Sequence, residues 1–228
     1  MAEHNLPGRP PVPLTLRRSP RARRISLRVS RLDGRVTLTL PRGVPEGEAL
    51  AFARDKEAWI RDNLAAAPER LQVDIGGLLP IGGELRRIEP GAGRRVVLHP
   101  DRIEVPKEAA PRRLQSFLRV LARDRLAAAS DHYAAALGVN YSRLTLRDTR
   151  SRWGSCSSQG ALMYSWRLIL APPDVLRYVA AHEVAHLREM NHSPAFWNLV
   201  EQLYGDYGPP RKWLRVEGSS LHQFRFGD

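Results

Sequence analysis

The stretch that decides how this chain is interpreted is PPDVLRYVAAHEVAHLREMNHSPAFW, residues 172–197. A proline pair opens it, as is typical of the first turn of a helix. Apolar residues then recur at helical spacing: Val175, Leu176, Val179 and Leu187. The pattern predicts a helix from Pro173 to about Met190, and Ser193-Pro194 predicts the N-cap and first position of another.

Two histidines in the first predicted helix have the spacing of a metal-binding pair. His182 and His186 are four residues apart, so they lie on one face with about 6 Å of rise between them. Glu183 is rotated by about 100° from His182, beside the metal, where it can take a proton from a metal-activated water. A structural alternative is two histidines on a half-buried face, with Glu183 in a surface ion pair.

The third ligand is constrained by the length of the helix. Glu189 lies about 10.5 Å along the axis from His182, too far for both to bind one zinc ion at about 2 Å. His192 comes after the predicted helix end, in an elbow that can fold back over the pair. Glu201 and Asp206 are the alternatives. Three neutral histidines leave one coordination position open for water, which is typical of a catalytic zinc site.

Length and composition set the class of protein. The 228 residues include 26% charged and 43% apolar side chains, as in ordinary globular proteins. No apolar run approaches the roughly 20 residues that span a bilayer, and the first residues lack the apolar core of a secretory signal. Cys156 is the only cysteine. These features predict a cytoplasmic protein.

The charge is concentrated near the N-terminus. The net charge is +12, and residues 1–42 contain ten arginines against Glu3 and Asp33, which is +8 of that total. Such a block attracts nucleic acid or other polyanions. The sequence therefore predicts a possible weak, non-specific contact with nucleic acid through this segment. The alternative is an arginine-rich face that is simply solvated.

The N-terminal half predicts mostly strands. Residues 1–13 are rich in proline and glycine and predict a disordered arm. Residues 25–29 and 36–40 alternate around a turn at 32–35, which predicts a hairpin, and residues 46–66 predict a helix. Short strands are expected at 84–89, 94–99 and 102–105. No internal repeat is detectable.

The C-terminal half predicts a different pattern. Residues 108–137 form the longest helical pattern, with Gly138 at its C′ position. Strands are expected at 142–148 and 161–170, with a loop over 151–160 between them. A last helix is expected near Pro210.

Several motifs together resemble a known family, the YgjP-like metallopeptidases, which is related in its catalytic core to the SprT/Spartan and WLM metalloproteases. The motifs are Ser151–Ser157 (SRWGSCS), Trp166-Arg167-Leu168, His182–His186, Asn191–Pro194 and Phe196-Trp197. The resemblance implies that His182, His186 and His192 bind zinc and that Glu183 is the catalytic acid/base. It is close over residues 143–215 and looser over 15–105. Ser165 stands where the family usually has Asn, so the role of that position stays open.

A few polar residues have two interpretations each. Arg152 and Arg167 are predicted to form surface ion pairs or to bind a substrate carboxylate or phosphate. Tyr204 and Tyr207 are predicted to pack, or to donate to the oxyanion of a tetrahedral intermediate. Cys156 is predicted to be a small buried apolar residue, with a reactive thiol as the alternative.

These observations predict an α+β protein with a zincin-like core, in which the HExxH helix packs on a small antiparallel sheet. The expected domains are a disordered arm (1–13), a β-rich subdomain with one helix (14–106) and a catalytic domain (107–228). The edge strand of the sheet, at 161–165, would align an extended peptide. The predicted function is a metallopeptidase with one zinc ion per chain. The alternatives are a nucleotide or phosphoanhydride hydrolase with the same metal centre, and a nucleic-acid-binding protein with structural zinc.

Overall fold

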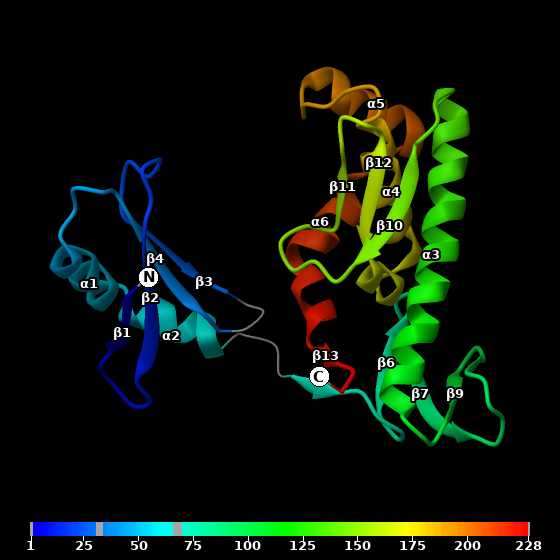
Figure 1. Cartoon of the computed structure of the whole chain (residues 1–228), viewed down its shortest axis with the longest axis horizontal. Coiled ribbons are helices and arrows are strands. Elements are labelled where there is room, and N and C mark those ends of the chain that lie inside the picture. Colours follow the sequence, from blue (N-terminus) through cyan, green and yellow to red (C-terminus); the bar gives the residue numbers. More distant parts are fainter. Residues whose placement is uncertain (1, 31–33, 66–69, 228) are drawn as a thin grey trace. The chain divides into compact units, whose positions relative to one another are not determined.

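The computed structural model describes residues 2–30, 34–65 and 70–227, which form two units, Met1–Glu69 and Arg70–Asp228 (Figure 1). The sequence predicted the boundary after residue 106, and the structure corrects it. Strand residues before 106 share one buried core with the long helix after it: Leu79, Ile81, Ile88, Ile103 and Val105 with Leu114 and Leu118. Of the prolines in that segment, Pro80, Pro90 and Pro106 lie within strands of the second unit, and Pro100 lies in a bend between two of them.

The N-terminal unit contains a four-stranded sheet in the order β1-β2-β4-β3. Its strands are β1 (Ala2–Leu6), β2 (Val12–Arg18), β3 (Ser26–Val29) and β4 (Val36–Leu40). β1 is antiparallel to β2, β2 is parallel to β4, and β3 is antiparallel to β4. The predicted hairpin of β3 and β4 is confirmed, while its turn falls partly on residues 31–33, outside the described part.

The predicted disordered arm over residues 1–13 is corrected by β1. This strand pairs along its whole length with β2, and Leu6 is 2% exposed in the unit's core. Proline and glycine lie mainly in the turn between the two strands. A prediction of disorder from composition alone therefore fails for a segment that pairs with another strand.

Two helices cover one face of this sheet. The single helix predicted over residues 46–66 is divided at Lys56 into α1 (Glu46–Asp55) and α2 (Glu57–Ala65). The covered face and the helices bury one apolar cluster: Leu14, Leu16, Val36, Leu38, Leu40, Ala49, Ala53 and Ile60. Because side chains alternate along a strand, the other face carries Thr15, Arg17, Ser26, Arg28, Thr37 and Thr39.

The second unit begins with a sheet of the same pairing pattern. Its strands are β6 (Leu78–Ile81), β7 (Glu84–Gly91), β8 (Val97–Leu98) and β9 (Arg102–Pro106), in the order β6-β7-β9-β8. The pairs are again antiparallel, parallel and antiparallel. The strand order and pairing of the first sheet are therefore repeated in the second. The sequence does not reveal this repeat, because strand pairing tolerates different residues.

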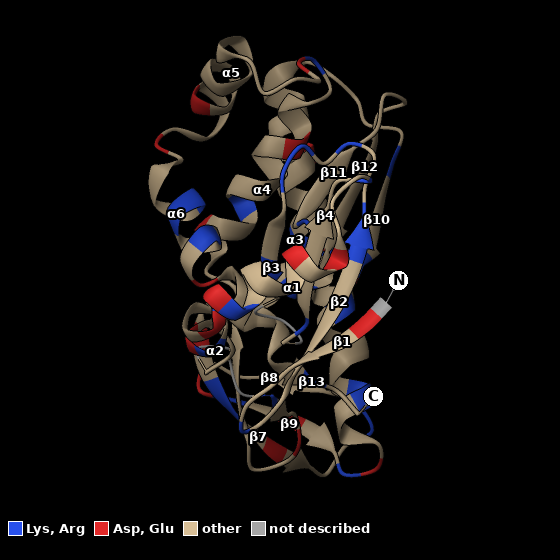
Figure 2. Cartoon of the chain, turned by 90° about the vertical axis from the view of Figure 1, so that its left-hand side faces the viewer, with Lys and Arg blue, Asp and Glu red and all other residues tan. Residues whose placement is uncertain are grey.

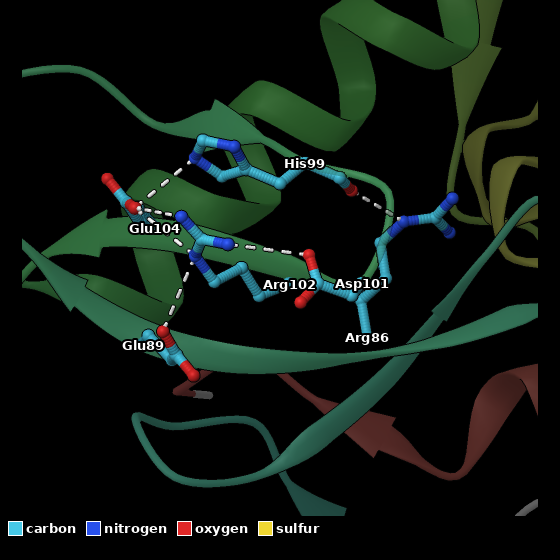
Figure 3. A network of polar contacts seen from close by, with 6 residues as sticks. All are labelled: Arg86, Glu89, His99, Asp101, Arg102 and Glu104. Atoms are coloured by element: carbon cyan, nitrogen blue, oxygen red, sulfur yellow. Dashed lines mark hydrogen bonds and ion pairs between the residues drawn. The ribbon is translucent and has the colours of Figure 1, made fainter.

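The polar side chains on this second sheet neutralise one another (Figure 3). Arg102 lies within ion-pair distance of Glu89, Asp101 and Glu104, at 3.2 to 3.6 Å. His99 Nε2 lies 3.2 Å from Glu104, and Arg86 donates to the His99 carbonyl at 3.0 Å. Arg102 is thus matched by Glu104 on its own strand, by Asp101 just before it and by Glu89 on the neighbouring β7.

A long helix, α3 (Ala110–Leu137), comes after the second sheet and ends as predicted at Gly138, which has a left-handed conformation with φ 68°. It packs against a third sheet made of β10 (Arg143–Arg147), β11 (Gly154–Cys156) and β12 (Ala161–Ser165), in the order β10-β12-β11. β10 is parallel to β12, and β11 is antiparallel to it. The sheet is therefore mixed, which corrects the prediction of an antiparallel one.

Two further predictions about this sheet are wrong. The expected edge strand, 161–165, is the central strand β12, and the edge beside it is β11, which lies in the expected loop. The expected strand 161–170 ends at Ser165, where the 3-10 helix η1 (Trp166–Leu170) begins. All of η1 is buried, and a continuous apolar run does not distinguish a strand from a helix.

The remaining helices are α4 (Pro173–Ala185), α5 (Pro194–Tyr204), α6 (Gly208–Val216) and the 3-10 helix η2 (Gly218–His222). The last strand, β13 (Phe224–Arg225), pairs in parallel with β5 (Leu71–Gln72). α4 packs on α3, on α5 and on β11. None of the helices in the described residues is long and apolar enough to cross a membrane. The architecture is of the mixed α+β class, as predicted.

Candidate metal centre

Three histidines converge at the C-terminal end of α4. His182 lies in the last turn of the helix, His186 is its C-cap, and His192 lies in the elbow before α5. One ring nitrogen of each lies within 4.8 Å of the others, and the Nε2 atoms of His182 and His192 are 3.1 Å apart. Glu201 and Asp206, the sequence-based alternatives, are not part of this cluster.

The elbow is shaped by backbone hydrogen bonds and a cap. α4 ends at Ala185, five residues before the predicted end, and a tight turn comes next in which Leu187 N–H donates to Val184 O at 2.9 Å. The Ser193 side chain then accepts from Phe196 N–H at 3.3 Å and starts α5, as predicted. The turn and the cap together reverse the chain and bring His192 back to His182.

The protonation states of the rings suit metal binding. His186 Nδ1 lies 2.9 Å from the Glu189 carbonyl oxygen, so a proton on Nδ1 is donated there and Nε2 keeps its lone pair. Burial, followed by the neighbouring His186 and His192, lowers the pKa of His182 to about 3. A neutral imidazole is the form that binds a metal ion.

Glu183 lies beside the histidines, under the backbone of β11. Its side chain is buried, with 5% exposed. A Cβ atom at Gly154 would lie only 2.5 Å from Glu183 Oε1, so glycine is what lets the strand approach this carboxyl group. Burial raises the pKa of Glu183 to about 8, opposed by the charge of Arg152.

These residues surround a pocket of about 230 Å³. Its lining is His182, Glu183, His186, Met190 and His192 from one side and Arg152, Gly154, Ser155 and Cys156 from the other. Burial and the nearby Glu183 raise the pKa of the Cys156 thiol to about 11. The thiol is therefore half-buried in the wall of the pocket and protonated at neutral pH.

The two arginines singled out in the sequence have different environments. Arg152 lines the pocket, whereas Arg167 is 4% exposed and does not. Arg167 donates to both carboxylate oxygens of Asp148, at 2.7 and 3.0 Å, and to the carbonyls of Leu221 and Phe224, each at 3.0 Å. Arg167 therefore ties the C-terminal segment to the loop that leads into β11.

The same segment supports the loop through Trp153. The His222 ring lies 5.2 Å from the Trp153 ring, and a Cβ atom at Gly218 would lie 3.2 Å from that indole. Asp148 and His222 were missed by sequence reasoning. A buried arginine implies a carboxylate partner, but nothing in the sequence indicates which one.

Neither tyrosine considered for oxyanion binding lines the pocket. The Tyr204 hydroxyl donates to the Asp174 carbonyl at 3.0 Å, and Tyr207 stacks on Trp197 with ring centres 5.2 Å apart. Ser165 is fully buried beside Trp166, and its hydroxyl oxygen has no partner in the described residues.

Comparison with known proteins identifies one family. The model of the YgjP-like metallopeptidase domain matches residues 23–217. No curated protein matches the chain. The crystal structure of the metallopeptidase zymogen of Pyrococcus abyssi abylysin is similar at 19% identity, with a TM-score of 0.36, over 40% of this chain and 95% of that one.

Proposed function

This chain belongs to the YgjP-like metallopeptidase family, and on that premise we propose that it hydrolyses peptide bonds at one zinc ion held by His182, His186 and His192. In this proposal Glu183 is the general base. The observation that carries it is the convergence of three histidine nitrogens beside a buried carboxyl group in one pocket.

The donor set fits a zinc ion. Two nitrogens bound to one tetrahedral zinc at about 2.05 Å are separated by about 3.3 Å. The Nε2 atoms of His182 and His192 are 3.1 Å apart, close to that separation. His186 is oriented by the Glu189 carbonyl so that its Nε2 can be a ligand. A zinc ion bound there supplies a Lewis acid that polarises a carbonyl group and lowers the pKa of a water molecule towards about 7.

Glu183 would handle the protons. Its carboxylate accepts the proton that the attacking water loses, and the resulting acid returns it to the amine that leaves. The backbone of β11 at Gly154 lies close against this side chain and restricts where the carboxyl group can lie. Met190 and the half-buried Cys156 also line the pocket.

The edge that aligns the substrate is β11 in this proposal, in place of 161–165. Ser165 N–H donates to Trp153 O, and Ser157 N–H donates to Ala161 O, so Trp153 and Ser157 use their main-chain groups on β12. Because these groups alternate along an antiparallel strand, those of Gly154 and Cys156 point away from β12. An extended peptide can pair with them there, beside Glu183.

The pocket favours a peptide over a phosphoanhydride. Phosphate groups are usually held by several arginines or lysines. Among the described residues that line this pocket, Arg152 is the one arginine or lysine. A closed structural zinc site is also disfavoured, because three histidines leave one coordination position for water and Glu183 faces the same space.

The test is the Glu183→Gln variant of the full chain, with zinc, on a mixture of fluorogenic peptides. We expect retained zinc and a rate lower by about 10²- to 10⁴-fold, because the amide keeps the shape of the side chain but is not a base. Glu189→Gln is the matched control and should keep both zinc and rate. Unchanged turnover by the Glu183 variant contradicts the proposal, and cleavage of nucleoside triphosphates in place of peptides supports the alternative.

A further inference from the structure

The uncovered face of the N-terminal sheet is mainly basic, and Glu3 of β1, opposite Thr15, is the acidic residue described on it. In the register of β2, β4 and β3, Arg17 lies opposite Thr39 and Arg28 lies opposite Thr37, with Thr15 and Ser26 completing the two rows. The loop 19–25, which joins the strand ends beside Arg17 and Ser26, adds further arginines. We call this surface the basic face and define it by Arg17, Arg21, Arg23, Arg24 and Arg28, all exposed.

These arginines lack carboxylate partners among the described residues. None of the five makes an ion pair with another side chain in the described part of the chain, whereas the adjacent Arg18 points to the helix side and pairs with Glu46 at 3.5 Å. The described acidic residues of the unit lie mainly on α1 and α2 (Figure 2): Glu46, Glu48, Asp55, Glu57 and Asp62. Glu3, on β1, is the exception. Most described carboxylates of the unit are thus on the helix side of the sheet, where they face the basic residues Arg18 and Arg61.

The second sheet is a useful reference for this arrangement. It has the same strand order and pairing, yet its Arg102 is surrounded by three carboxylates. The five guanidinium groups of the basic face, two on strands and three in the loop 19–25, repel one another, and a bound polyanion would relieve that repulsion. We propose that the basic face binds the phosphate backbone of nucleic acid without reading its sequence.

The chemistry of the face fits phosphates better than a lipid surface. Arginine binds phosphate oxygens with two parallel hydrogen bonds, and the threonine and serine hydroxyls between the arginines are further donors. The rows that contain Arg17, Thr37 and Thr39 include no exposed aromatic or large apolar side chain that would insert into a bilayer. The lack of aromatic residues in these rows also gives no platform for stacking bases, so contacts are limited to the backbone.

The experiment measures binding of the full-length protein to labelled single strands and duplexes of about 20 nucleotides at several salt concentrations. Five phosphate contacts correspond to a slope of log K against log salt of at most about −4.5 on duplex DNA. We therefore expect binding at about 50 mM salt that weakens by up to about 100-fold at about 150 mM. Replacing the five arginines of the basic face by serine should abolish most of this binding and flatten the slope.

The matched control removes the same charge from the second unit by replacing five exposed arginines with serine: Arg94, Arg95, Arg112, Arg119 and Arg143. This variant should keep the wild-type slope. If the five-fold variant of the basic face does not fold, Arg17→Ser with Arg28→Ser replaces it. The proposal is overturned if the wild type does not bind at low salt, if the control loses binding instead, or if phosphatidylserine vesicles bind and nucleic acid does not.

Discussion

The two four-stranded sheets of this chain have the same strand order and the same sequence of antiparallel and parallel pairs. They differ in the elements that come after the fourth strand. After β4 come two short helices that complete a small core, whereas after β9 comes α3, which spans 28 residues and packs on β9, β10, η1 and α4. The two units therefore differ in the elements added to a shared strand order, and the histidine cluster belongs to elements of the second unit.

The two sheets also differ in how the charges of their arginines are balanced. On the second sheet Arg102 is surrounded by Glu89, Asp101 and Glu104, while on the first Arg17 and Arg28 have no carboxylate partner among the described residues. The catalytic apparatus that we propose lies in the unit with the balanced sheet. The unbalanced sheet belongs to the unit that has no histidine cluster among its described residues.

The comparison predicts that the two cores can be damaged separately. Leu38→Ala, at a fully buried position of the N-terminal core, should destabilise that unit by about 2–5 kcal/mol because it leaves a cavity. Hydrogen exchange should accelerate in β2 and β4 and stay unchanged in α4, with zinc content preserved. Leu118→Ala is the reciprocal variant. Equal acceleration in both units by either variant would show that the division into two cores is wrong.

A second prediction concerns the support of the pocket. Arg167→Ala should destabilise the second unit by about 3 kcal/mol, because it removes a buried charge pair and two bonds to the C-terminal segment. Arg167→Lys keeps the charge but not the planar guanidinium group, so the stability of this variant should lie between those of the wild type and the alanine variant. Urea unfolding measures the effect. A loss below about 0.5 kcal/mol would mean that this pair is only a surface ion pair.

The smallest expected change in free energy comes from Gly154→Ala. The added methyl group would lie 2.5 Å from Glu183 Oε1 and displace the carboxyl group. We expect kcat/KM to fall by about 100-fold, or about 2.7 kcal/mol, with little change in zinc content. Gly47→Ala adds the same group in open space and should leave the rate unchanged. A fully active Gly154 variant would indicate that Glu183 is free to move.

The sequence predicts the local parts of this site better than its surroundings. Helical spacing placed His182, Glu183 and His186 on one helix, and Ser193-Pro194 indicated the elbow that carries His192, because caps and periodicity are local signals. The neighbours of the site were not predictable in this way. Gly154 is sequence-distant from Glu183, and its importance comes from one close approach in space.

Longer-range features were the ones that the sequence misrepresented. β1 was interpreted as disordered because the composition of a segment does not show whether another strand, here β2, pairs with it. β12 was expected at an edge, but it is central because β10 pairs with it on the side away from β11. This order of strands is not a local signal in the sequence. Residues 78–106 were assigned to the first domain because packing on α3, and not the chain order, decides to which core they belong.

The most direct test of the account is the zinc content of the freshly purified full chain, measured by elemental analysis for the wild type and for His192→Ala. His132→Ala, at an exposed histidine outside the cluster, is the control. The account predicts about one zinc per chain in the wild type and the control, and almost none in His192→Ala after dialysis, because two histidines alone hold zinc weakly. Zinc retained at the wild-type level by His192→Ala, or absent from the wild type even after titration with zinc, would contradict the assignment of the metal centre.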